Sequence, residues 1–360
     1  MTHQELPSYD QAPAGAIRFN TDSRKLEVYT GGPVGYGTLP NGQWMQVDSF
    51  TPDTATGGTR GLWAGGNNPA VFGGAYNGTN IIDYANLDST GNAIDFGDRT
   101  VAVYNLSALA SSTRALFGGG FLNPTITNVI DYVTIASTGN AIDFGDKTAS
   151  EAGAACASST RGLFAGGSVP SPSTNNSIEY VTISSLGDTV DFGDLNYSGS
   201  VSTFSAFSSS TRGIFSGGQT PTNQDGIQFV TISTLGNAAD FGVLTSARTY
   251  AGSCSNSVRG VIAGGYTPSL LNNIEYVTIS TLGDAVDFGD LTAVWMDAGG
   301  CASPTRGVWG GGAGPDTSTI LNRMEYVQIM STGNSIDFGD LTTARKAITS
   351  GACSNGHGGL

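Results

Sequence analysis

The tripeptide Asp-Phe-Gly occurs six times in the chain and is the first candidate for catalytic chemistry. In protein kinases the aspartate of this tripeptide binds magnesium beside ATP. An active site needs one such ligand, whereas here the tripeptide returns at steps of 47 to 50 residues. This multiplicity predicts a structural repeat and argues against a phosphotransferase built on the motif. The six aspartates are Asp95, Asp143, Asp191, Asp240, Asp287 and Asp337.

One arginine also recurs in every repeat, within a segment that reads Thr-Arg-Gly in four of the six copies. One Arg and one Asp per repeat favour a buried or half-buried bidentate pair within or between repeats. A ring of six arginines that grips a ligand is the alternative. Calcium binding at the Asp-Phe-Gly turns is also conceivable, but the sequence there does not have the D-x-D-x-D-G spacing of a calcium-binding loop. The six arginines are Arg60, Arg114, Arg161, Arg212, Arg259 and Arg306.

Other catalytic side chains are scarce. His3 and His357 are the only histidines, and both lie near chain ends, where a Ser-His-Asp triad would have little scaffold. Paired carboxylates for glycoside hydrolysis stay open, because 29 acidic residues offer many pairs. We otherwise predict a protein that is not an enzyme, with no catalytic residue, no cofactor and no metal.

The four cysteines occupy one equivalent position of the repeat, where the other two copies carry Leu109 and Phe207. A position that accepts Cys, Leu or Phe is a buried apolar one, and a free cysteine behaves there as a small hydrophobe. No C-x-x-C pair exists to bind zinc. We therefore predict four free, buried thiols: Cys156, Cys254, Cys301 and Cys353.

Charge and composition narrow the function classes. The formal net charge is −14 and the chain has three lysines, so no basic stripe is available to neutralise nucleic-acid phosphates. An acidic surface also repels anionic membranes. The N-terminus has no signal-peptide pattern, and no apolar run approaches the roughly 20 residues that span a bilayer. We expect no nucleic-acid partner, no membrane insertion and synthesis in the cytoplasm.

Each repeat contains four short strand patterns separated by Gly, Asn, Asp and Ser turns. In the copy at 251–292 they are 251–255, "GVIAGG", "IEYVTI" and "VDFGDL". Four strands at this period are typical of a β-propeller blade, and six copies predict an all-β, six-bladed propeller over residues 51–360. The phenylalanines of the tripeptide are expected to pack between blades: Phe96, Phe144, Phe192, Phe241, Phe288 and Phe338.

The two ends of the repeat region complement each other. The first copy has a poor first strand before Thr59, whereas the chain ends in a segment that aligns with a first strand. We predict that the segment around Ile348–Cys353 supplies the missing strand and closes the ring, which removes two unpaired sheet edges.

Residues 1–50 lie outside the repeat and form a separate N-terminal β segment. "AIRFN" and "KLEVYT" are alternating strands joined by a turn, and "QWMQV" is a third candidate. A unit of this size has little core and usually packs on a partner or an oligomer, so a homo-oligomer is left open.

The repeat resembles the kelch family over about residues 55–360. The double glycine after the second strand, the "IEYVTI" third strand, the aromatic residue in the fourth and the "LTSAR" (244–248) and "LTTAR" (341–345) turns carry the resemblance. Phenylalanine replaces the usual kelch tryptophan, which indicates a divergent group. This variant is similar to structural proteins of tailed phages of marine and cyanobacterial hosts.

The N-terminal segment resembles a β-motif of phage tail-fibre and other virion proteins. The resemblance implies a virion location, with residues 1–48 as the docking segment for other virion proteins. An ordinary hairpin packed on the propeller is the alternative. The matching residues are Gly15, Ile17, Arg18, Phe19, Asn20, Thr21, Asp22, Lys25, Leu26, Glu27, Tyr29 and Trp44.

The repeats differ most between their second and third strands, and in a propeller these loops share one face. We expect a non-enzymatic, tail- or fibre-associated virion protein whose loop face binds protein or a host-surface glycan or receptor. A phage glycan depolymerase and a capsid decoration protein are the alternatives, and drift of the loops without function also stays open. The exposed apolar candidates on this face are Tyr76, Phe121, Tyr266, Leu270 and Leu271.

Overall fold

The N-terminal unit is a three-stranded antiparallel sheet in the order β1-β2-β3. Its strands are Ile17–Asn20, Lys25–Tyr29 and Trp44–Gln46, as the sequence pattern predicts. The chain divides into two units, residues 1–56 and 57–360. The computed structural model describes residues 15–20, 25–29, 44–46, 59–73, 77–148, 150–170, 175–197 and 199–360.

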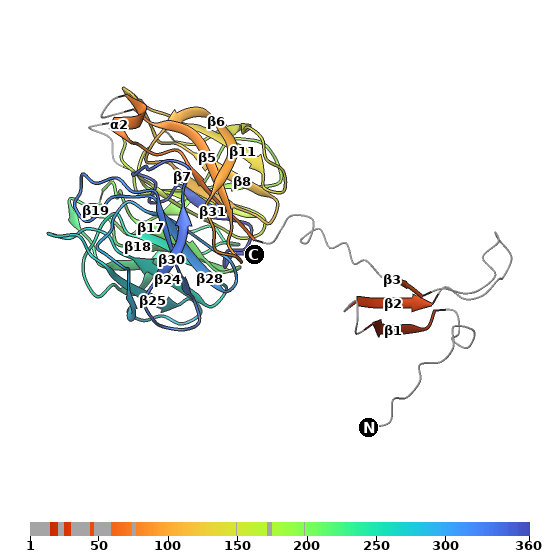
Figure 1. The fold of residues 1–360 in the computed structure, drawn as a ribbon. Coiled ribbons are helices and arrows are strands. Elements are labelled where there is room, and N and C mark those ends of the chain that lie inside the picture. Colours follow the sequence, from red (N-terminus) through yellow and green to blue (C-terminus); the bar gives the residue numbers. More distant parts are fainter. Residues whose placement is uncertain are drawn as a thin grey trace. The chain divides into compact units, whose positions relative to one another are not determined.

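The larger unit is a six-bladed propeller of four-stranded antiparallel sheets, which confirms the predicted fold (Figure 1). From the channel outward, blade 1 consists of β31 (Ala352–Ser354), β4 (Arg60–Ala64), β5 (Thr79–Asn86) and β6 (Ile94–Val103). Blade 2 consists of β7 (Ser107–Ala110), β8 (Arg114–Gly118), β11 (Val129–Thr134) and β12 (Ile142–Asp146). Blade 3 consists of β13 (Ala154–Ala157), β14 (Arg161–Ala165), β15 (Ser177–Thr182) and β16 (Val190–Asp194). Blade 4 consists of β17 (Ser205–Ser208), β18 (Arg212–Ser216), β21 (Gly226–Thr231) and β22 (Ala239–Val243). Blade 5 consists of β23 (Gly252–Ser255), β24 (Arg259–Ala263), β25 (Asn273–Thr278) and β26 (Val286–Asp290). Blade 6 consists of β27 (Gly299–Ala302), β28 (Arg306–Gly310), β29 (Arg323–Gln328) and β30 (Ile336–Asp340).

Short elements decorate the loops between the second and third strands. Blade 1 carries the helix α2 (Pro69–Phe72), which Asn68 caps and the left-handed Gly73 ends. Blade 2 carries the hairpin of β9 (Phe121–Leu122) and β10 (Thr125–Ile126), and blade 4 that of β19 (Gln219–Thr220) and β20 (Thr222–Asn223). Within the described residues, no helix has the length and apolar character to cross a membrane.

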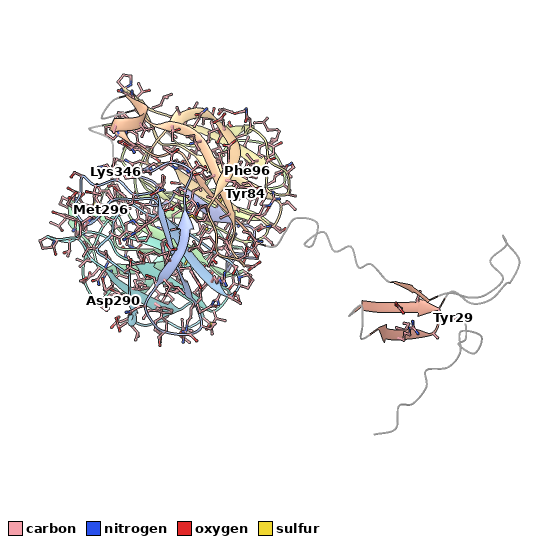
Figure 2. The ribbon with its side chains drawn as sticks, viewed as in Figure 1. Tyr29, Tyr84, Phe96, Asp290, Met296 and Lys346 are labelled. Carbon is pink, nitrogen blue, oxygen red and sulfur yellow. The ribbon has the colours of Figure 1, made fainter. Side chains whose placement is uncertain are left out.

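The core lies between neighbouring blades, because the inner strands bury both faces. The phenylalanines of Asp-Phe-Gly are each 2 % exposed, as expected for inter-blade packing residues. Phe96 belongs to a cluster with Phe117 and Val133 of the next blade. It also meets Tyr84 edge to face, with ring centroids 5.6 Å apart (Figure 2). Such contacts stabilise a pair of rings beyond the area they bury.

The C-terminal strand closes the ring, as predicted. β31 pairs antiparallel with β4, with Cys353 opposite Leu62. The pairing covers Ala352–Ser354 only, so the closing strand is shorter and lies slightly later than the segment predicted from the sequence. Blade 1 thereby combines the two ends of the repeat region, and β31 covers the inner edge of β4.

The outer rim consists of the fourth strands and the turns that precede them, and hydrogen bonds close it from blade to blade. A glycine N–H in each turn donates to the carbonyl of the Asp-Phe-Gly phenylalanine in the preceding blade, at 2.8 to 2.9 Å. These bonds satisfy backbone groups that an outer strand would otherwise leave unpaired. The six pairs are Gly139–Phe96, Gly187–Phe144, Gly236–Phe192, Gly283–Phe241, Gly333–Phe288 and Gly91–Phe338.

This junction explains the recurrent tripeptide. Gly97 has φ +144°, and a Cβ there would lie 2.5 Å from the carbonyl oxygen of Gly139. Only glycine permits both the conformation and the approach of the neighbouring backbone. The tripeptide is therefore a blade junction: its phenylalanine is buried, its glycine admits the next turn, and its aspartate is exposed.

Candidate functional site

The six repeated arginines join neighbouring blades. Arg259 Nη1 donates to the carbonyl of Ile329 in the next blade at 3.2 Å, and its guanidinium lies 4.4 Å from the centroid of the Tyr276 ring. Every copy makes the same two contacts, so the arginines hold blades together. The receiving carbonyls belong to Ile135, Ile183, Ile232, Ile279, Ile329 and Leu87, for Arg60, Arg114, Arg161, Arg212, Arg259 and Arg306 respectively.

The predicted Arg–Asp pair is wrong. Within the part of the chain that the structure describes, no ion pair joins these arginines to the six aspartates, all of which are exposed. The outer strand turns the aspartate toward solvent because the neighbouring phenylalanine takes the buried face. The aspartates are Asp95, Asp143, Asp191, Asp240, Asp287 and Asp337.

The buried acids occupy a different position, which the sequence analysis missed. We call it the acid position: the third-strand residue directly before the aromatic one. Its side chain accepts a hydrogen bond from a backbone N–H of the preceding blade, such as Thr100 N to Asp131 Oδ2 at 2.9 Å. The sequence signal that could have revealed this position is an acidic residue directly before the third-strand aromatic residue in five of the six repeats. The six members are Asp83, Asp131, Glu179, Gln228, Glu275 and Glu325.

Four of the five charged members of the acid position form an ion pair with an arginine. Arg99 Nε lies 2.9 Å from Asp131 Oδ1, and Arg345 Nη1 lies 3.0 Å from Asp83 Oδ2. Burial lowers the pKa of Arg99, and Asp131 opposes that effect. The other two ion pairs are Arg248–Glu275 and Arg323–Glu325. Burial lowers the pKa of Lys147 to about 8, and Glu179 opposes that effect.

In blade 4 both the acid and the cation are replaced by uncharged residues. Gln228 holds its acid position, and Leu195 stands where blade 1 has Arg99. The amide oxygen of Gln228 still accepts from Asn196 N at 2.7 Å. A buried charge is costly unless it is paired, so loss of the acid removes the need for the cation. These buried charges are accounted for by ion pairs within the propeller scaffold.

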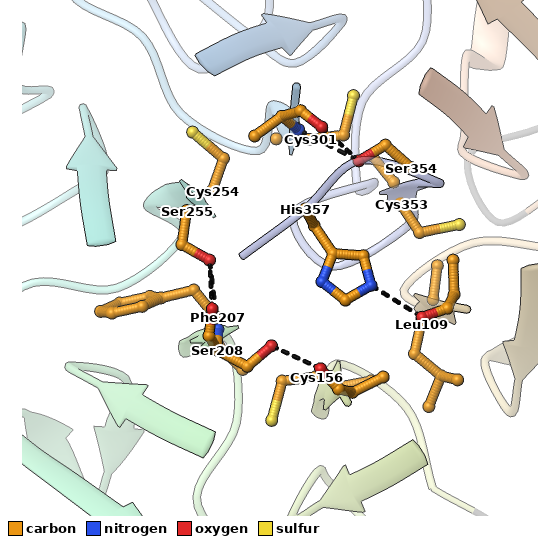
Figure 3. Close-up of a pocket in the computed structure, with 18 of the residues that line it drawn as sticks. Leu109, Cys156, Phe207, Ser208, Cys254, Ser255, Cys301, Cys353, Ser354 and His357 are labelled. Atoms are coloured by element: carbon orange, nitrogen blue, oxygen red, sulfur yellow. Dashed lines mark hydrogen bonds between the residues drawn. The ribbon is translucent and has the colours of Figure 1, made fainter. Parts of the chain in front are cut away.

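The cysteines are free and buried on the innermost strands, as predicted. Burial raises the pKa of the Cys156 thiol to about 12. Figure 3 shows the four sulfurs directed away from the channel centre. Those of Cys156, Cys254 and Cys301 face second-strand glycines of the next blade. Among the described residues, no group of three or more His, Cys, Asp or Glu side chains is placed to hold a metal ion.

The central channel is narrow and is blocked by the C-terminal residues. Its cavity has a volume of about 50 Å³ and is lined by Ala, Ser, Cys, Gly, Leu109 and Phe207 of the first strands together with His357. The His357 Nε2–H donates to the Ala110 carbonyl at 2.7 Å, because Nδ1 accepts from Gly359 N at 3.0 Å (Figure 3). Enclosure of the ring lowers its pKa. Such a volume holds about one or two waters, so the channel is no substrate site.

A closed ring of backbone hydrogen bonds surrounds the channel at the loop face. In each blade, the segment that leads into the first strand contains one non-glycine residue with a left-handed conformation, with φ between 54° and 62°. At five junctions its N–H donates to the carbonyl of the equivalent residue in the preceding blade, and Ile348 N completes the circle to Asp297. Non-glycine residues adopt this conformation only where the surroundings impose it. The ring consists of Asn105, Ala152, Thr203, Tyr250, Asp297 and Ala347.

Three titratable side chains at this ring do not recur from blade to blade. Burial raises the pKa of Asp297 to about 6, although Thr349 Oγ1 donates to it at 3.0 Å. Burial also raises the pKa of Glu151 and of Tyr250, and both carboxylates add to the shift of the tyrosine. A protonated carboxyl is what a glycosidase needs as general acid. The cavity beside Asn105 measures only about 10 Å³, which leaves no room for a sugar ring.

The predicted loop residues lie on this face but are half-buried, so their expected exposure is wrong. Phe121 packs on Tyr104, with ring centroids 5.2 Å apart. Tyr266 pairs through its backbone with Thr249 and Leu270, and Leu271 is half-buried as well. Tyr76 lies outside the described residues.

Two features of the loop face were not predicted. Val71, in α2, is 57 % exposed, and the Asn-Pro pair that starts this helix was the sequence signal. Hydrogen bonds also connect loops of adjacent blades: Asn223 Nδ2 donates to Tyr266 O at 3.2 Å, and Asn123 Nδ2 to Asn77 Oδ1 at 3.3 Å. The loops therefore present a preorganised surface.

No protein-family model matches the chain, and no curated protein is found to be similar to it.

Proposed function

We propose that this protein is a non-enzymatic binding module of a phage virion, associated with the tail or a fibre. Its loop face binds a host-surface glycan or a protein. The observation that carries the proposal is the contrast between a uniform, closed scaffold and six different loops on one face. Hydrogen bonds between the loops reduce the ordering cost of binding.

The virion assignment rests on the sequence resemblances to kelch-like phage proteins and to the tail-fibre motif. The N-terminal sheet supports it, because β1 and β3 are the outer strands of a small unit. An outer strand offers backbone groups with which another chain can pair. Residues 1–48 are accordingly the segment that docks to other virion proteins, and the propeller is the part that binds outside the particle.

A glycan array with the full chain tests the loop face. Val71→Asp and Thr125→Asp change exposed residues of two loops, and Thr138→Asp is the matched control on a turn at the opposite face. We expect glycan binding that the loop variants weaken and the control preserves. Equal binding by all three variants would contradict the assignment of the loop face, and an array without any bound glycan would contradict a glycan ligand.

A glycan depolymerase is the second candidate, favoured by Glu151 and Asp297 at the ring of the loop face. Incubation of the bound glycan with the full chain distinguishes the two functions. Our proposal predicts a polysaccharide of unchanged length, whereas shortening that Glu151→Gln or Asp297→Asn abolishes would establish the enzyme. Gold labelling of particles distinguishes a tail or fibre position from capsid decoration.

A further inference from the structure

One side of the outer rim departs from the repeat toward apolar residues. The turn before the fourth strand carries Leu186, Leu235 and Leu282 in blades 3 to 5, where blades 1, 2 and 6 carry threonine. Val243 replaces the aspartate that follows Asp-Phe-Gly in the other blades. In the turn between the first and second strands of blade 5, Val258 replaces the threonine before the repeated arginine. We call these five residues the apolar arc. Their exposed fractions range from 40 % to 59 %.

The residues of the arc are neighbours because each turn packs on the preceding blade. Gly283, next to Leu282, donates to the Phe241 carbonyl at 2.9 Å, and Ala285 N donates to Val243 O at 2.8 Å. Leu282 therefore lies beside the strand that ends in Val243. The junction of blades 3 and 4 places Leu235 beside β16 in the same way. The arc therefore extends over three adjacent blades.

The fold does not require these apolar residues. Equivalent positions with the same hydrogen bonds carry Thr or Asp in the other blades, so folding is compatible with a polar rim. By contrast, the exposed Ile or Val that starts the fourth strand recurs in five blades and follows from the preference of β-branched residues for strands. An exposed apolar surface concentrated on one side is typical of an interaction site.

The charged residues around the apolar arc indicate which kind of partner binds to it. Within the described residues of blades 3 to 5, no lysine or arginine is exposed. Exposed carboxylates flank the arc: Asp191, Asp194, Asp240, Asp287 and Asp290. A second copy of this chain, with net charge −14, would be repelled, and so would an anionic membrane. A complementary partner combines apolar side chains with lysine or arginine.

We propose that the apolar arc is a docking surface for a protein that presents apolar side chains flanked by basic ones. This surface is separate from the loop face and does not depend on the function proposed for it. Complementary charge would orient the partner, and burial of the leucines would supply most of the affinity.

Two amphipathic helical peptides with the same leucine face test the proposal, one with lysine and one with glutamate on the polar face. A resurfaced full chain, Leu186→Thr/Leu235→Thr/Leu282→Thr/Val243→Asp/Val258→Thr, copies residues that the other blades carry and is expected to melt like the wild type. The matched control is Ile94→Ala/Ile336→Ala, which copies Ala239 onto the opposite side of the rim.

We expect the lysine peptide to bind the wild type and the control equally, and the resurfaced chain about tenfold more weakly or worse. The proposal is overturned if the lysine peptide fails to bind, if resurfacing leaves its affinity unchanged, or if the glutamate peptide binds as well. Self-association of the wild type that resurfacing abolishes would instead identify a second copy as the occupant. Glycan binding by the resurfaced chain should be unaffected.

Discussion

At the residue scale, the buried charges act as matched pairs and not as a catalytic set. Asp131→Ala should lower the free energy of unfolding by about 3–5 kcal/mol, because it leaves the guanidinium of Arg99 buried and unpaired. Arg99→Leu should also be costly, since it isolates the carboxylate. Arg99→Leu/Asp131→Gln reproduces the Leu195–Gln228 pair of blade 4 and should cost clearly less than the sum of the two. Urea denaturation measures all three variants, and additive costs would contradict the pairing.

His357 provides a pH-dependent contribution. Its pKa is lowered in the folded state, so unfolded chains bind more protons as the pH falls below the ordinary histidine value of about 6.5. The stability that His357 contributes is fully present above that pH and is lost as the pH falls through the folded-state pKa. Protonation of Nδ1 also removes the acceptor for Gly359 N–H.

His357→Gln lacks the titratable ring and should flatten this part of the stability curve. Thermal melts of both chains between pH 7.5 and pH 5, at matched ionic strength, measure the difference. The opposing contribution of Asp297, whose pKa is raised to about 6, remains in both proteins and cancels in the comparison. A wild-type curve parallel to that of the variant would show that the ring does not titrate as described.

At the element scale, substitutions of two rim glycines distinguish the cost of a strained backbone from the cost of a steric clash with the neighbouring blade. Gly97→Ala should lower stability by more than the roughly 1–3 kcal/mol of a strained backbone, because its Cβ would also meet the Gly139 carbonyl. Gly139 has φ +153°, but a Cβ added there would meet no atom within 4 Å, so Gly139→Ala incurs the strain alone. Equal denaturation midpoints for the two variants would argue against the blade junction.

The elements themselves could be predicted from the sequence, because six copies of one pattern reveal strand order, blade number and ring closure. The acid–cation pairs could not, since the cation comes from different positions of the repeat, at Arg99 in one blade and Arg248 in another. Exposure of the loop residues also escaped prediction. Phe121 is half-buried because Tyr104, which lies outside the loop pattern, packs against it.

At the scale of the whole molecule, stability depends on closure by the C-terminal strand. Deletion of residues 346–360 removes β31 and leaves the inner edge of β4 unpaired, which should cost several kcal/mol, a large share of the typical stability of a domain. Deletion of the exposed Leu360 alone is the control and should leave the melting temperature nearly unchanged. A long truncation that melts like the full chain would contradict ring closure.

Hydrogen exchange of the full chain, with and without the glycan that the array identifies, tests the central claim most directly. Binding at the loop face predicts slower exchange in the loops between second and third strands, with unchanged exchange in the outer rim. Protection confined to the rim, or no protection in any loop at saturating glycan, would contradict the account. The segments expected to gain protection are 67–73, 121–128, 219–226, 266–273 and 313–323.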